Sequence, residues 1–168
     1  DPPKRYYDER FGSQGWSNAV TLNLSIGQGE NSQTVVNMAR FYTALATDGQ
    51  AARPEIVRGR AERTRLFSLN DVQLAGIQGA LANVVGRGTA AGSRLQGIAV
   101  AGKTGTAQNA QDANADHAWF VGYAPAEEPK IVVAVMLEFG LHGSRAARIA
   151  TRIMELDRPD EPGDEQAD

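Results

Sequence analysis

Apolar residues recur at intervals of three and four in three segments of the chain: 34–46, 70–85 and 144–156. One face of a helix repeats at this interval, so each segment is predicted to form an amphipathic helix with its apolar face on the core. The inward residues of the last helix are expected to be Ala146, Ile149, Ala150 and Ile153.

A second pattern, rich in β-branched and aromatic residues, predicts strands at 118–123 and 130–139 that are joined as a hairpin. The second strand is apolar on both faces, which is typical of a sheet centre. The run Ile98–Ala101 predicts a short buried strand that leads into Lys103-Thr104-Gly105-Thr106. We therefore expect an α/β (α+β) fold, in which an antiparallel sheet is flanked by helices.

The remaining segments carry weaker signals. Residues 1–20 are expected to form a loop pinned by aromatic side chains, and Thr21–Ile26 a short strand. Residues 59–64 are charged and are expected to form an exposed loop or hairpin. Residues 158–168 are acidic and contain two prolines, so we expect a disordered tail after a single domain at 1–157.

Composition excludes several classes of function. The 168 residues carry a net charge of −3, and no basic cluster is interleaved with aromatic residues, so nucleic acid is not an expected partner. The chain has no cysteine, which excludes disulfides, thiol nucleophiles and thiolate metal sites. No apolar run is long enough to cross a bilayer. The chain begins at Asp1 rather than at methionine, so we expect a processed or excised piece of a longer protein.

The strongest candidate site is Lys103-Thr104-Gly105-Thr106. On a strand, Lys103 and Gly105 would face one way and Thr104 and Thr106 the other. Gly105 has no Cβ and allows another group to approach the backbone. An ammonium group, hydroxyl groups and backbone N–H groups at a sheet edge suit a small ligand that carries a carboxylate.

Residues 97–104 also match the phosphate-loop pattern G-x-x-x-x-G-K-[ST], which leaves nucleotide binding as an alternative. That motif requires a strand before the loop and a helix after it. Here residues 91–96 form a poor strand, and Gly105 and Asn109 stand where a helix should begin. The context therefore favours a strand over a phosphate loop.

Lys103-Thr104-Gly105 resembles the third motif of the penicillin-binding transpeptidases and serine β-lactamases, whose set is S-x-x-K, S-x-N and K-T-G. Other passages are similar to class B penicillin-binding proteins, especially the elongation-type ones: Ile26-Gly27-Gln28-Gly29-Glu30, residues 34–49, Arg53-Pro54, Gly88-Thr89-Ala90 and residues 117–125. The likeness runs in one order over about residues 1–155. It implies a partial penicillin-binding transpeptidase fold, from the carboxy-terminal part of that domain.

The resemblance also implies an activity. In that family a serine attacks the D-Ala-D-Ala end of a peptidoglycan stem peptide, forms an acyl-enzyme and passes the acyl group to another stem peptide; β-lactams acylate the same serine. Lys103 would place charge beside the S-x-N hydroxyl and help to transfer protons. Thr104 and Thr106 would offer hydroxyls to the substrate carboxylate, Gly105 would leave space, and the Thr106 N–H would join the oxyanion hole. No cofactor and no metal are implied.

The resemblance further implies a place in the cell and partners for the full-length protein. Such proteins are anchored at the periplasmic face of the inner membrane by a segment that would lie upstream, and a glycosyltransferase is an expected partner. The two other catalytic motifs are not found in their family places. No lysine has a serine three residues before it, and Ser68-Leu69-Asn70 fits S-x-N but follows residues 26–30 instead of preceding them.

Ser68 or Asn70 is therefore expected to be a helix cap. We expect that the chain alone cannot form an acyl-enzyme and needs the missing amino-terminal half of the domain. A non-catalytic ligand-binding or scaffold remnant of the same fold is the main alternative. His117, His142, Asp116 and Ser144 allow a metal site or a triad, but no spacing supports either, and both histidines are expected at turns or strand ends.

Overall fold

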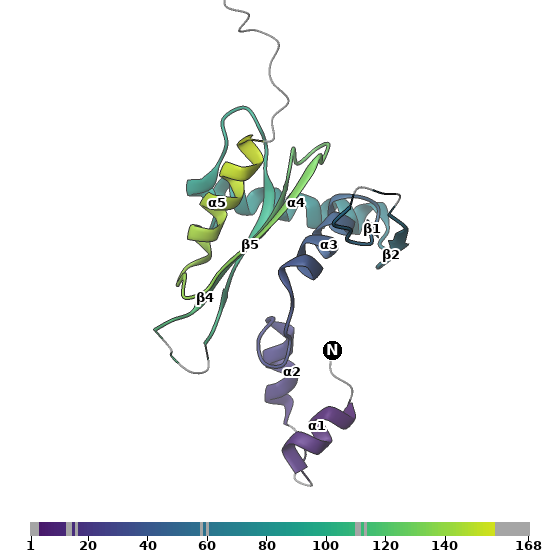
Figure 1. Ribbon diagram of the computed structural model, residues 1–168, viewed down its shortest axis with the longest axis vertical. Coiled ribbons are helices and arrows are strands. Elements are labelled where there is room, and N and C mark those ends of the chain that lie inside the picture. Colours follow the sequence, from purple (N-terminus) through teal and green to yellow (C-terminus); the bar gives the residue numbers. More distant parts are fainter. Residues whose placement is uncertain are drawn as a thin grey trace, which may run out of the picture. The chain divides into compact units, whose positions relative to one another are not determined.

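The protein is described by a computed structural model that covers residues 4–12, 15, 17–57, 59, 61–109, 112 and 114–156 (Figure 1). Its elements are α1 (Lys4–Phe11), α2 (Asn18–Ser25), α3 (Val35–Ala46), β1 (Gln50–Ala52), β2 (Arg63–Arg65), α4 (Asp71–Arg87), the 3-10 turn η2 (Ala91–Ser93), β3 (Ala101–Ala107), β4 (His117–Ala124), β5 (Ile131–Leu137) and α5 (Gly143–Leu156). The chain divides into two compact units, Asp1–Thr34 and Val35–Asp168. The expected acidic tail at 158–168 lies outside the described residues.

The described part of the first unit contains two helices, α1 and α2, which corrects the loop expected within 1–20 and the strand expected at Thr21–Ile26. In α1 the buried Tyr7 stacks on Phe11, with ring centroids 6.3 Å apart. In α2 the Ser17 side chain caps the helix by accepting a hydrogen bond from the backbone of Ala19. The cap favours a helix here, and no buried residue of α2 favours a strand instead.

The second unit is built on an antiparallel sheet with the strand order β3-β4-β5. The hairpin of β4 and β5 is confirmed, but β5 lies at an edge of the described sheet and not at its centre. The strand predicted at Ile98–Ala101 is wrong in its bounds. Strand β3 begins only at Ala101, and Ile98 instead pairs with Leu95 in an isolated bridge.

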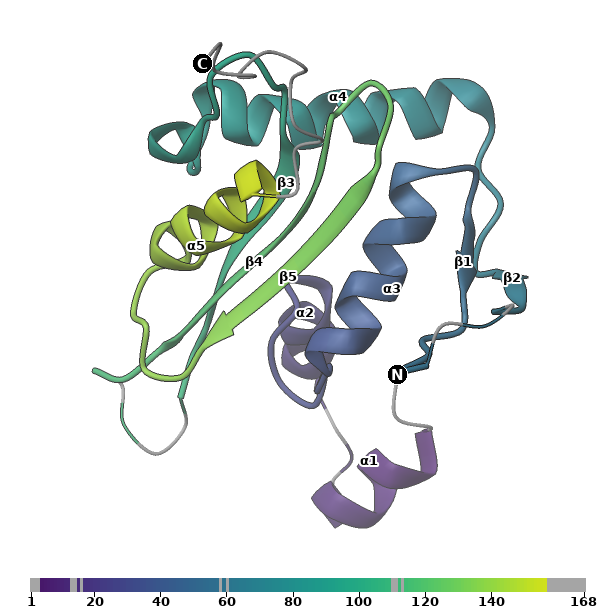
Figure 2. The same cartoon turned by 45° about the horizontal axis from the view of Figure 1, so that its top comes forward.

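Helices cover both faces of this sheet (Figure 2). Helix α5 covers one face, where its small residues and Met154 pack with Phe120 in one core cluster. Helix α3 covers the other face, where Tyr42 and Leu45 pack with Tyr123 in a second cluster. Helix α4 contacts β3 and contributes Val85 to the first cluster and Leu81 to the second. The expected antiparallel sheet flanked by helices is therefore confirmed.

All three predicted helices are present, and the structure refines two of them. Asn70, and not Ser68, caps α4: its side chain accepts from Gln73 N at 2.9 Å, and Gln73 accepts in return from Asn70 N. In α5 the expectation for Ile149 and Ile153 is wrong, because both side chains are more than 40% exposed. Ala146 and Ala150 are buried as expected, together with Ala147, Thr151 and Met154. A helix that lies close to a sheet accepts small residues at the contact and turns larger ones outward.

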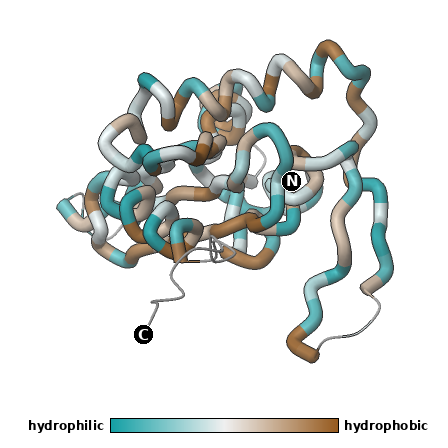
Figure 3. The backbone as a smooth tube through the Cα atoms, turned by 90° about the horizontal axis from the view of Figure 1, so that it is seen from above, coloured by the Kyte–Doolittle hydropathy of each residue, from teal (hydrophilic) through white to brown (hydrophobic). Residues whose placement is uncertain are grey.

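Strands β1 and β2 pair between α3 and α4, a pairing that the sequence did not predict. In the segment 59–64, expected to be an exposed loop or hairpin, residues 63 and 64 belong to β2, whose three residues are all exposed. Gly49 starts the turn into β1 with a φ of 90°, and a Cβ there would lie 2.4 Å from the carbonyl oxygen of Phe67, so only glycine fits. Ile56 and Val57 follow β1 and are almost fully exposed. Figure 3 colours the backbone by hydropathy and shows a projecting loop with a hydrophobic end. None of the described helices is both long and apolar enough to cross a bilayer.

Candidate active site

The four residues of the sequence-predicted site lie on β3, which pairs with β4 alone among the described strands and forms an edge of the sheet. Lys103 lies opposite Val121, which belongs to the core beneath α3, whereas Thr104 lies opposite Phe120, which belongs to the core beneath α5. The predicted alternation of faces is therefore confirmed. A phosphate loop at 97–104 is wrong, because residues 101–107 are strand and the next described element is another strand.

Lys103 presents its charge at this edge without a compensating carboxylate. Its side chain is exposed, and Nζ donates a hydrogen bond to the carbonyl oxygen of Thr104 at 2.6 Å. Among the described residues it forms no ion pair. An ammonium group in this position is available to an incoming anion.

Thr104 is held by a residue that lies fifteen positions earlier. Its Oγ1 lies 2.6 Å from Oγ1 of Thr89, so one hydroxyl donates and the other accepts. Thr89 follows α4 in a turn fixed by two backbone hydrogen bonds, from the N–H groups of Gly88 and Ala90 to the carbonyl of Val84. Thr89 lies in a passage that resembles the family, but the sequence does not predict this contact, because no periodicity places a turn against a strand.

The start of α5 lies directly over the same stretch of β3. A Cβ at Gly143 would lie 2.7 Å from the carbonyl oxygen of Gly105, 2.8 Å from that of Trp119 and 2.9 Å from Cβ of Thr104. The helix can therefore approach the strand only because residue 143 is glycine. Its amino-terminal end carries a partial positive charge, which adds to that of Lys103 near this edge. No pattern in the sequence marks Gly143 either.

Thr106 completes the stretch. It is exposed, lies opposite Ala118 and shares a face with Thr104 two residues earlier. Gly105, between them, leaves little room on its own face: a Cβ there would lie 3.3 Å from Cβ of Trp119. The arrangement joins an ammonium group on one face with two hydroxyl-bearing residues on the other, along one exposed edge. Chemically, this edge suits recognition of a carboxylate.

Comparison with known proteins agrees with this geometry. The family described as "Penicillin binding protein transpeptidase domain" matches residues 5–155. This chain belongs to that family. The peptidoglycan D,D-transpeptidase MrdA of Acinetobacter baumannii is 30% identical over 177 residues, which cover 91% of this chain and 26% of MrdA. The chain thus spans about a quarter of the length of this curated relative. The resemblance inferred from the sequence is confirmed.

Solved structures of penicillin-binding proteins share the fold. Pseudomonas aeruginosa PBP2, crystallised in complex with WCK 5153, matches with a TM-score of 0.80 and 32% identity, over 97% of this chain and 39% of that one. Penicillin-binding protein A of M. tuberculosis, solved as an imipenem acyl-enzyme complex, matches with a TM-score of 0.69 and 26% identity, over 79% of this chain and 32% of that one.

The histidines lie outside the K-T-G stretch of this penicillin-binding protein chain. His117 begins β4, where its Nδ1 accepts a hydrogen bond from Phe139 N at 3.3 Å, and His142 is exposed in the turn before α5. Both positions are a strand end or a turn, as expected. Within the described part of the chain, no hydrogen bond joins the side chains of His142, Ser144 and Asp116, and no cluster of three or more potential ligands could hold a metal.

Proposed function

We propose that this chain supplies the K-T-G strand of a serine-type peptidoglycan D,D-transpeptidase. The observation that carries the proposal is the exposed ammonium of Lys103, which has no ion pair among the described residues and lies on an edge strand whose other face carries the hydroxyl of Thr104. Membership of the penicillin-binding protein family and the name of the relative, peptidoglycan D,D-transpeptidase MrdA, support a peptidoglycan stem peptide as the substrate, and the proposal places its D-Ala-D-Ala end at this edge.

Each residue then has a defined role. Lys103 attracts the substrate carboxylate and assists proton transfer to and from the nucleophilic serine through the S-x-N hydroxyl. Thr104 and Thr106 donate hydroxyl hydrogen bonds to the carboxylate, and the missing Cβ of Gly105 avoids crowding against Trp119. The Thr106 N–H stabilises the oxyanion of the tetrahedral intermediate, an interaction whose loss costs about 10²- to 10³-fold in rate in related chemistry.

β-Lactams act at the same place in this proposal. They carry a carboxylate and a reactive carbonyl in the positions of the stem-peptide terminus, so the edge of β3 binds either molecule by the same contacts. The support comes from the similar M. tuberculosis protein, whose structure is described as an imipenem acyl-enzyme complex.

The nucleophile itself lies outside this chain. No S-x-x-K occurs in the 168 residues, so the serine and its lysine are supplied by a further segment of the protein or by a second polypeptide. In this proposal the complete protein is membrane-anchored at the periplasmic face of the bacterial inner membrane and works with a glycosyltransferase, as the resemblance implies. The isolated chain binds substrate ends weakly and does not form an acyl-enzyme.

Labelling with a fluorescent penicillin tests the proposal. The chain alone should remain unlabelled, whereas a preparation completed with a polypeptide that carries S-x-x-K and S-x-N should be labelled on that serine. Lys103→Ala should then slow labelling by about 10²-fold or more. Lys130→Ala is the matched control, because Lys130 pairs with Glu128 in the hairpin turn.

Two results would count against the proposal. Labelling of the chain alone would show that it holds its own nucleophile. A completed preparation that folds but never labels would favour the alternative of a non-catalytic scaffold with the same fold.

A further inference from the structure

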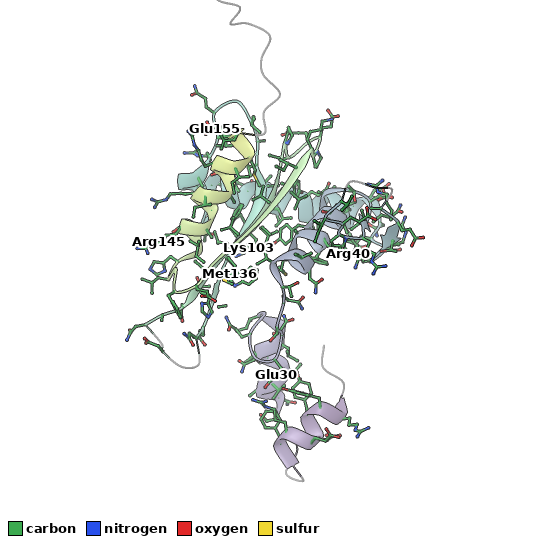
Figure 4. All side chains as sticks on the ribbon, in the orientation of Figure 1. Glu30, Arg40, Lys103, Met136, Arg145 and Glu155 are labelled. Atoms are coloured by element: carbon green, nitrogen blue, oxygen red, sulfur yellow. The ribbon has the colours of Figure 1, made fainter. Side chains whose placement is uncertain are left out.

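The turn that follows α4 carries Thr89, and little packing holds it in place. Residues 86–89 are exposed, whereas Ala90 is buried. A segment with so few buried contacts opens easily unless hydrogen bonds restrain it. The Thr89 hydroxyl nevertheless lies 2.6 Å from that of Thr104, on the strand that Lys103 marks in Figure 4. We therefore looked for the hydrogen bonds that fix the turn.

The side chain of Arg94 spans this turn. Its Nε donates to the carbonyl oxygen of Ala91 at 3.1 Å, and its Nη1 donates to that of Gly86 at 3.4 Å. Gly86 lies in the last turn of α4, where carbonyl oxygens have no partner within the helix. The two acceptors lie on either side of Thr89 in the chain. One guanidinium group therefore joins the two ends of the segment that presents the Thr89 hydroxyl.

A guanidinium group suits this bridge better than an ammonium group does. Its donors have a fixed planar arrangement, so two of them can hold two carbonyl oxygens at a set spacing, whereas the donors of a lysine rotate freely. The other hydrogen bonds of the turn are made by its backbone, from Gly88 and Ala90 to Val84. Among the described residues Arg94 forms no ion pair that could draw its side chain elsewhere.

We propose that Arg94 is a positioning residue for the K-T-G strand: it holds the ends of the turn so that the Thr89 hydroxyl stays against Thr104. The inference rests on the proposed transpeptidase function, and Arg94 itself does not touch the substrate. Two simpler roles make different predictions. Attraction of an anionic substrate by charge alone would be shared by Arg87, which is exposed at the end of α4. Stabilisation of the helix end alone would not act through Thr89.

Hydrogen exchange of the full 168-residue chain tests whether Arg94 holds the turn, and it needs no enzymatic activity. In Arg94→Gln the N–H groups of Gly88 and Ala90 should lose about three- to tenfold of their protection, as expected when a net hydrogen bond is removed from a local opening. The N–H groups of β4 should keep their protection, because the sheet itself is not altered. Arg87→Gln, which removes the same charge, should leave the turn protected.

The rate of labelling by a fluorescent penicillin, measured on the completed transpeptidase, tests whether the turn positions the site. Arg94→Gln should slow labelling about three- to tenfold, whereas Arg87→Gln should leave the rate unchanged. Arg94→Lys keeps the charge without the planar fork and should restore only part of the rate. In a Thr89→Val background, Arg94→Gln should slow labelling by less than about twofold further, because two residues that act through one contact are not additive.

Several results would overturn the inference. Unchanged protection of the turn in Arg94→Gln would show that this side chain does not hold it. Equal slowing in Arg94→Gln and Arg87→Gln, or full activity in Arg94→Lys, would show that only charge matters. Independent, multiplying losses in the double variant would show that Arg94 does not act through Thr89. If the completed protein never labels, the proposed function fails instead, and the exchange measurement alone decides whether Arg94 holds the turn.

Discussion

The hydroxyl of Thr89 contacts the hydroxyl of Thr104 at 2.6 Å, and this contact joins the turn after α4 to the first threonine of the K-T-G strand. A threonine hydroxyl can rotate, and its role as donor or acceptor depends on its neighbours. The contact with Thr89 therefore determines on which side the Thr104 hydroxyl can form a hydrogen bond with a ligand. Thr89 is a positioning residue and does not itself need to touch the ligand.

Replacement of Thr89 by valine should remove this contact while keeping the shape of the side chain. We expect the acylation rate of the completed transpeptidase by a β-lactam to fall about three- to tenfold, since one neutral hydrogen bond contributes about 0.5–1.5 kcal/mol. The measurement is the second-order rate of labelling by a fluorescent penicillin. Thr89→Ser keeps the hydroxyl and should restore most of the rate; equal rates for serine and valine would contradict a positioning role.

Gly143 should not tolerate a side chain. Gly143→Ala places a Cβ within 2.9 Å of three atoms of β3 and β4, two of them backbone oxygens that cannot turn away. We expect the free energy of unfolding to fall by about 1–3 kcal/mol, as measured by urea denaturation. Gly79→Ala is the matched control: it lies within α4 with nothing within 4 Å of the new Cβ and should stabilise the protein by about 0.5–1 kcal/mol. A loss of similar size in both variants would contradict the close approach of α5.

The sequence predicts those elements whose local signals and burial agree. In α4 an apolar stripe follows a capping residue, and in the β4–β5 hairpin two β-branched runs flank a short connection. In α2 the residues Val20, Leu22 and Leu24 alternate with polar ones, which favours a strand, but none of them is buried and the capped helix prevails. A pattern of apolar and polar residues predicts secondary structure only where its apolar side chains are buried in a core.

At the K-T-G stretch, too, the sequence predicts the features that depend on local structure. The strand, its alternating faces and the exposure of Lys103 follow from seven consecutive residues, because strand geometry is local. The contacts of Thr89 and Gly143 depend on where two distant turns return to β3, and no local pattern contains that information. The exposed faces of Ile149 and Ile153 were missed for a related reason: hydrophobicity does not report how closely α5 approaches the sheet.

Asn70 and Ser68 can be separated as caps of α4 by a pair of variants. Asn70→Ala removes the acceptor for Gln73 N and should lower the free energy of unfolding by about 1 kcal/mol. Ser68→Ala should change it by less than about 0.5 kcal/mol, because the Ser68 side chain makes no hydrogen bond to the described residues. Thermal unfolding of both variants checks the prediction, and a larger loss for Ser68→Ala would reverse the assignment.

Two buried tyrosines should make the protein sensitive to alkaline pH. Burial raises the pKa of Tyr42 to about 12, with a smaller contribution from the nearby Tyr123, and burial raises the pKa of Tyr123 to about 12 as well. In the unfolded chain a tyrosine loses its proton near pH 10. Between about pH 10 and 12 the unfolded state therefore binds fewer protons than the folded state, and the free energy of unfolding falls as pH rises.

The expected loss is about 1 kcal/mol for each tyrosine by pH 11, measured by urea unfolding at pH 9, 10 and 11. Tyr123→Phe should reduce that loss, and at pH 7 it should leave the stability unchanged or raise it, because the Tyr123 hydroxyl is buried without a hydrogen-bond partner among the described residues. Tyr6→Phe, at a partly exposed position of α1, should leave the alkaline loss as it is in the unsubstituted chain. If both variants lost stability equally between pH 9 and 11, burial of Tyr123 could not be the cause of the alkaline transition.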